Sequence, residues 1–197
     1  MAITNGYVTL ADLKTYLNIS GATEDARLET AIESASRAID AYTRRVFYAT
    51  SAVKYFQSEP DFGHTVIIDD DLLTVTEIAT DDQNTRVYTA WAGSDYELEP
   101  VNSGPPYNMI RVAPLAVKTF PIWPRGVRIT GTWGFAATAP QAVGDACLIL
   151  GARYYKRKDA PFGVVGTPEL GLMRVTSKDH DVAALLMPYR RMDVVGV

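Results

Sequence analysis

The strongest pattern in the sequence is an apolar stripe within its first 50 residues. Its members recur at alternating spacings of four and three: Leu28, Ile32, Ala35, Ile39, Tyr42 and Val46. This spacing is typical of an amphipathic helix with one buried face, here roughly 22 residues long. Thr23 is the expected helix cap, and the acidic pair Glu24 and Asp25 suits the first turn. Arg44 and Arg45 place positive charge where such a helix ends.

Caps and breakers predict three shorter helices. Thr9 and Asp12 have the spacing of a capping box before a helix over 10–17. Pro140 begins another helix, whose apolar stripe is Val143, Cys147, Leu150 and Tyr154. Asp179 or Asp181 caps a last short helix that ends at Pro188.

Between the second and third helices the chain alternates short β-branched or aromatic segments with Asp, Asn, Gly and Pro. This texture predicts strands and turns. The expected strands are 53–56, 65–68, 73–78, 86–90, 96–98, 109–112 and 127–133. The acidic triplet 69–71 and the pair 81–82 are expected in turns, and the proline-rich stretch 100–107 in a loop.

These elements predict an α+β fold with long amphipathic helices from both ends of the chain. The expected division is a helical core of 1–52 and 136–159, a small antiparallel β-rich insertion of 53–135, and an extended C-terminal arm of 160–197 that carries the short last helix. Residues 160–178 contain too many glycines and prolines for a regular element.

Composition restricts the function without defining it. The formal charge of −4 and pI of about 5.2 argue against a protein that coats duplex DNA. The longest apolar run is far shorter than the ~20 residues that cross a bilayer. Cys147 is the single cysteine, so no intrachain disulfide can form.

The sequence offers little for catalysis or metal binding. His64 and His180 are the only histidines, and neither acidic cluster has the alternating ligands of a calcium loop. No nucleophile elbow or phosphate-binding glycine loop is present. We therefore expect neither an enzyme nor a bound cofactor.

The most distinctive charged feature is a basic cluster at the end of the third helix, formed by Arg153, Lys156, Arg157 and Lys158. Basic residues there complement the helix dipole without any partner. The alternative is a docking surface for an acidic protein, in which Phe162, Val164 and Val165 supply apolar anchors.

Five segments follow one another in a characteristic order: YVTLADLKTYLNI, EDARLETAIESASRAIDAYTRRVF, VRITGTWGF, PQAVGDACLILGARYYKRKDAPFG and the closing GVVGTPELGLMRVTSKDHDVAALLMPYRR. Their order and spacing resemble the head-tail connector, or adaptor, proteins of long-tailed bacteriophages and gene transfer agents. The resemblance covers about 7–48 and 127–191, whereas the middle agrees only in general character.

This resemblance implies a structural protein, made in the bacterial cytoplasm, at the neck of a virion or phage-like particle. It implies a ring, typically of twelve copies, on the portal protein after DNA packaging. The ring would bind a stopper or tail-completion protein, with DNA passing through its channel and no membrane involved.

The resemblance also guides the choice of candidate contact residues. Those expected to bind the portal are Arg153, Lys156, Arg157, Lys158, Phe162, Val164, Val165, Leu170, Leu172 and Met173. Those expected between subunits lie on the long helix: Arg27, Glu29, Glu33, Arg37 and Asp40. Deletion of 160–197 is expected to leave a folded protein that cannot join the portal.

Two other functions remain open from the sequence. A carbohydrate-binding or hydrolytic domain would use Trp91, Trp123, Trp133 and the acidic turns in an aromatic cleft. Another neck protein, such as a stopper or a tail terminator, would also form rings but would be dominated by β structure.

Overall fold

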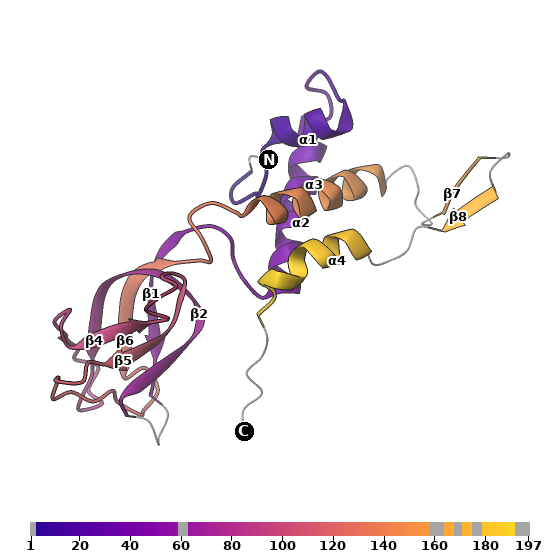
Figure 1. Cartoon of the computed structure of the whole chain (residues 1–197). Coiled ribbons are helices and arrows are strands. Elements are labelled where there is room, and N and C mark those ends of the chain that lie inside the picture. The colour runs from indigo at the N-terminus through magenta and orange to yellow at the C-terminus, as the bar shows by residue number, and fades with distance from the viewer. Residues whose placement is uncertain (1–2, 59–62, 158–163, 168–170, 175–178, 192–197) are drawn as a thin grey trace. The chain divides into compact units, whose positions relative to one another are not determined.

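The structure is a computed structural model that describes residues 3–58, 63–157, 164–167, 171–174 and 179–191. The chain forms two compact units (Figure 1). Met1–Arg45 and Ala139–Val197 make up the first, which we call the helical unit, and Val46–Thr138 makes up the second, the β unit. The α+β class expected from the sequence is confirmed.

Helix α1 covers Leu10–Leu17, as the sequence predicts, and its capping box is formed. The Thr9 hydroxyl accepts a hydrogen bond from the Asp12 backbone N–H at 3.1 Å, and the Asp12 carboxylate accepts one from the Thr9 N–H at 2.9 Å. Asn18 ends the helix in the left-handed conformation, with φ of 55°. Leu13 is fully buried, so this short helix anchors itself in the core.

Helix α2 covers Asp25–Thr43 and is shorter at both ends than predicted. Its first flanking residue is Glu24, so the prediction of Thr23 as the cap is wrong. Arg44 turns left-handed, with φ of 55°, and stops the helix before Val46. The stripe of Leu28, Ile32, Ala35 and Ile39 is buried as predicted, whereas Tyr42 remains 41% exposed.

Helix α3 covers Gln141–Lys156, directly after Pro140, and packs against α2. Helix α4 covers His180–Leu186, followed by the short 3-10 turn η2 at Met187–Tyr189. Asp179 caps α4, as one of the two predicted candidates. Figure 1 shows α4 alongside α3, and its Val182 and Leu186 are buried. The last helix is therefore part of the helical core, although the sequence suggests that it belongs to an arm.

The β unit is a six-stranded antiparallel sheet in the order β1-β6-β2-β5-β4, with β3 paired to β2. Its strands are β1 (Thr50–Phe56), β2 (Thr65–Thr80), β3 (Thr89–Ala90), β4 (Tyr96–Glu99), β5 (Tyr107–Val112) and β6 (Val127–Trp133). The inward-facing residues of this sheet, with Trp91 and Phe120 from the connections, form one apolar core.

Strand β2 corrects the sequence prediction of two strands separated by an acidic turn. It runs without a break through Asp69, Asp70 and Asp71. Its first part pairs with β5 and its later part with β6, and the register shifts between Ile67 and Leu72. The aspartates lie at this change of partner, where the register of the strand shifts. Because both partners are distant in sequence, the local pattern resembles a turn.

A second correction concerns the stretch expected to have no regular structure. Strands β7 (Val164–Thr167) and β8 (Gly171–Arg174) form an antiparallel hairpin, in which Val165 pairs with Met173. Short β-branched and apolar runs therefore outweigh the nearby glycines in this stretch.

Candidate interaction surface

The structure divides the predicted basic cluster. Arg153 lies 3.8 Å from the Asp179 carboxylate in an ion pair that joins α3 to the start of α4. Lys156 and Arg157 are exposed at the end of α3. Lys158, Phe162 and Leu170 lie outside the described residues. For Val164, Val165, Leu172 and Met173 only the place on the β7-β8 hairpin is described.

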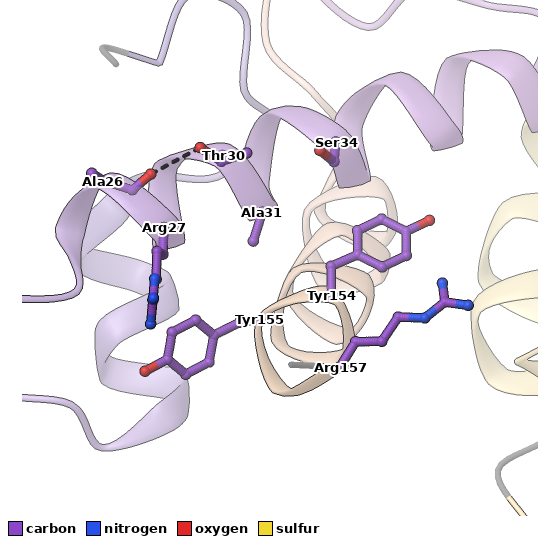
Figure 2. Close-up of a pocket in the computed structure, with 8 residues that line it drawn as sticks. All are labelled: Ala26, Arg27, Thr30, Ala31, Ser34, Tyr154, Tyr155 and Arg157. Carbon is purple, nitrogen blue, oxygen red and sulfur yellow. Dashed lines mark hydrogen bonds between the residues drawn. The ribbon is translucent and has the colours of Figure 1, made fainter. Parts of the chain in front are cut away.

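Arg157 contributes to an open groove between α2 and α3, with a volume of about 810 Å³. Figure 2 shows its lining, in which α2 provides small or hydroxyl side chains and Arg27, and the end of α3 provides two tyrosines and Arg157. The full lining is Ala26, Arg27, Thr30, Ala31, Ser34, Tyr154, Tyr155 and Arg157. The small residues on α2 leave room between the helices, and the larger side chains of α3 bound it.

Polar contacts join the start of α2 to α3 at one end of this groove. Glu24 accepts a hydrogen bond from the Tyr155 hydroxyl at 3.4 Å and forms an ion pair with Arg27 at 3.2 Å. The Glu24 carboxylate therefore binds side chains from both helices that line the groove. Two guanidinium groups and two tyrosines line the groove, a composition typical of residues that dominate binding energy in protein interfaces.

Three of the residues expected between subunits bind the chain's own N-terminal segment. The Glu33 carboxylate accepts hydrogen bonds from the backbone N–H groups of Thr4 and Asn5. Arg37 donates to the Asn5 carbonyl at 2.9 Å, and Asp40 accepts a hydrogen bond from the Tyr7 hydroxyl. Burial raises the pKa of the Asp40 carboxyl above its ordinary value.

The other two expected subunit residues lie on the same helix. Arg27, which lines the groove, pairs with Glu24, and Glu29 is half-buried. Gly6 is the one sequence signal for the crossing of the N-terminal segment over α2. A side chain there would lie within 2.8 Å of the Ile32 side chain, so the close approach requires glycine.

The side chains considered for chemistry lie apart from one another. Cys147 is buried against Ser36, and burial raises the pKa of its thiol. Within the described ranges, no three His, Cys, Asp or Glu side chains gather as a metal site would require. Trp91 and Trp133 belong to the β-unit core, so they do not line an open aromatic cleft.

None of the helices formed by the described residues is long and apolar enough to span a membrane.

Comparison with known proteins gives a family match and a fold match. Residues 7–90, which include α1, α2 and the first three strands, match the family described as phage gp6-like head-tail connector proteins. The resemblance read from the sequence is therefore confirmed. No curated protein sequence gives a significant match to the chain.

Three solved structures of gene transfer agent (GTA) particles contain chains with the same fold, and each match covers 100% of this chain and 96% of the other. The neck of the empty particle, computed with C6 symmetry, matches with a TM-score of 0.64 and 20% identity. The neck of the native particle, computed with C12 symmetry, gives 0.65 and 21%. The virion of the native particle gives 0.66 and 22%. The shared fold therefore includes both units.

Proposed function

We propose that this chain is a structural head-tail connector in the neck of a tailed phage or a phage-like gene transfer agent particle. The observation that carries the proposal is the full-length fold match to chains of particle necks. The family match over 7–90 supports it independently. The neck structures were computed with C6 and C12 symmetry, which favours a ring of repeated subunits, with twelve copies as the proposed number.

In this proposal one face of the ring docks on the portal after DNA packaging, and the other binds a stopper or tail-completion protein. DNA passes through the central channel. The net charge of −4 suits a channel that does not retain DNA. No step of this function requires catalysis.

The proposed portal contact combines the exposed cations Lys156 and Arg157 with the β7-β8 hairpin that follows them. Positive charge orients the approach to an acidic partner, and apolar residues of 162–173 hold it. A hairpin of two four-residue strands is too small to bury a core of its own, so binding to a larger partner would stabilise it.

The position of α4 determines how this contact is tested. Deletion of 160–197 would remove the buried Val182 and Leu186 together with the hairpin. A cleaner variant replaces 160–178 with a glycine-serine linker and keeps α4. We expect this variant to retain its helical circular dichroism and to fail to sediment with portal-containing heads. Normal co-sedimentation would overturn the proposed contact.

A second arm of the same experiment tests the charge. The variant Lys156→Glu with Arg157→Glu should bind heads more weakly, and the loss should be larger at low salt than at high salt because screening reduces the same attraction. Arg190→Glu is a matched control, since Arg190 is exposed on the same unit but outside this surface. An equal loss at all salt concentrations would contradict an electrostatic contact.

A further inference from the structure

Two arginines and two tyrosines of the β unit stack in a continuous row, which we call the arginine–tyrosine ladder. The Arg125 guanidinium lies 4.4 Å from the centre of the Tyr55 ring. The rings of Tyr55 and Tyr88 are 5.9 Å apart, and the Arg128 guanidinium lies 4.8 Å from the centre of the Tyr88 ring. The Tyr88 hydroxyl also donates to the Arg125 carbonyl at 2.8 Å. These contacts hold four long side chains in a fixed arrangement.

The ladder lies on the outer face of the sheet. Tyr55 on β1 is directly opposite Arg128 on β6. Side chains alternate along a strand, and the neighbouring Phe56 packs inward against the core and stacks on Trp133. Tyr55 is accordingly 40% exposed, and Val53 on the same face is 49% exposed. The ladder is therefore outside the core and available to a partner.

The two arginines of the ladder differ in their ion pairs. Arg128 forms an ion pair with Glu77 at 2.9 Å. Arg125 has no carboxylate within 4 Å among the residues that the structure describes. A guanidinium whose face stacks on an aromatic ring keeps its N–H edge free to bind an acid. Preordered tyrosine and arginine are also the side chains that most often dominate interface energies.

The opposite end of the same sheet carries the complementary charge. Strand β4 ends the strand order, as β1 does at the other end. Glu97 on β4 is exposed and, within the described part of the chain, has no cation within 4 Å. Its neighbour Glu99 lies 3.4 Å from Arg111. Among the described residues, an arginine without a carboxylate partner thus lies by one terminal strand, and a glutamate without a cationic partner lies on the other.

We propose that the ladder beside β1 of one copy binds the Glu97 edge of β4 in the next copy around the ring. This inference rests on the proposed ring and states where its subunits meet. The contact is heterologous, because two different surfaces join, and such contacts close rings. Two ladders facing each other would bring like charges together, which favours the head-to-tail arrangement. DNA phosphate is a poorer occupant, since the β unit has six Lys or Arg against eleven Asp or Glu.

Cysteine cross-linking on heads tests the contact directly. Val53→Cys and Ser94→Cys place thiols beside the two surfaces without altering the ladder or Glu97, because Val53 and Ser94 are both exposed. Cys147 is buried and should not react with a short bismaleimide. On portal-containing heads the double variant should give a series of multimers, and each single variant should give monomer. A mixture of the two single variants should give dimers and nothing larger.

Charge reversal provides the second measurement. Arg125→Glu and Glu97→Arg should each reduce cross-linked multimers about tenfold, and the combination should restore them because the pair is reformed with opposite polarity. Lys156→Glu is the control that separates the two proposals. It should weaken head binding and leave cross-linking per bound subunit unchanged.

The outcomes distinguish this inference from the proposed function. The subunits could form rings on heads in electron micrographs and yet give no cross-link between positions 53 and 94. That result would overturn the proposed contact but not the connector function. Single variants that cross-link to themselves would indicate a symmetric contact and also overturn it. A chain that never joins a neck would overturn the proposed function, and this inference with it.

Discussion

The two units differ in how the chain forms them, one from a single continuous stretch and the other from two separated segments. The β unit is one uninterrupted stretch, and its ends meet within it. The Phe135 N–H donates to the Val46 carbonyl at 2.7 Å, and the rings of Phe47 and Phe135 lie 5.3 Å apart. The helical unit instead joins helices from both sides of that stretch, since α2 precedes it and α3 follows it.

This difference has a consequence for folding. Bringing α2 and α3 together across a disordered Val46–Thr138 segment would cost the entropy of closing a long loop. Once the β unit has formed, its own contacts hold Val46 next to Phe135, so the remaining connection is short. Formation of the inserted sheet therefore lowers the entropic cost of bringing α2 and α3 together.

The largest effect is expected from removing one core side chain in each unit. Leu28→Ala and Ile78→Ala both empty a fully buried site and should each cost about 2–5 kcal/mol. All three tryptophans lie in the β unit, so their fluorescence follows that unit alone. Leu28→Ala should shift urea unfolding followed by helical circular dichroism more than unfolding followed by fluorescence, and Ile78→Ala should do the reverse. Equal shifts in both signals would mean that the chain unfolds as one cooperative unit.

A smaller effect is expected where the β unit closes on itself. Gly134 has φ of 134°, and a side chain there would lie 2.1 Å from the Tyr48 carbonyl oxygen. Gly134→Ala should therefore cost about 3 kcal/mol in fluorescence-detected unfolding, because the backbone must shift. Gly93→Ala is the matched control, since nothing lies within 4 Å of its added carbon, and it should change stability by no more than about 0.5 kcal/mol. A similar loss in both variants would contradict the prediction that the close backbone contact at Gly134 makes a side chain costly there.

Structure that depends on neighbouring residues can be predicted from this sequence, whereas structure that depends on pairing between distant strands cannot. The capping box of α1 and the Asp179 cap of α4 depend on residues within one turn, so the sequence is sufficient to place them. The continuity of β2 depends on β5 and β6, which lie far along the chain. An acidic triplet within a strand that changes partners therefore resembles a turn.

The candidate surface shows the same limit. The sequence identifies the cations at the end of α3, but the groove is formed by residues of α2 and α3 that lie more than 100 positions apart in the sequence. Charge periodicity on α2 is also ambiguous. A polar face that suits a neighbouring subunit suits the chain's own N-terminal segment equally well, and Glu33 binds that segment.

The smallest predicted effect separates two carboxylates within the helical unit. Hydrogen bonds from Thr9 lower the pKa of Asp12, whereas burial raises the pKa of Asp40. The stability that Asp12 contributes is present above its ordinary pKa and is lost as pH falls through the lowered value. For Asp40 the sign reverses, because the folded state favours the protonated carboxyl and stability is lost as pH rises through the raised value.

Unfolding of Asp12→Asn and Asp40→Asn, followed by circular dichroism between about pH 3 and pH 7, should show opposite trends. Asp12→Asn should be less stable than the parent chain by roughly 0.5–1 kcal/mol at neutral pH, and this deficit should shrink in acid. Asp40→Asn should gain relative to the parent chain as pH rises, because the amide cannot acquire the buried charge. Parallel trends would show that the Tyr7 hydrogen bond and the Arg37 charge together outweigh burial in the ionisation of Asp40.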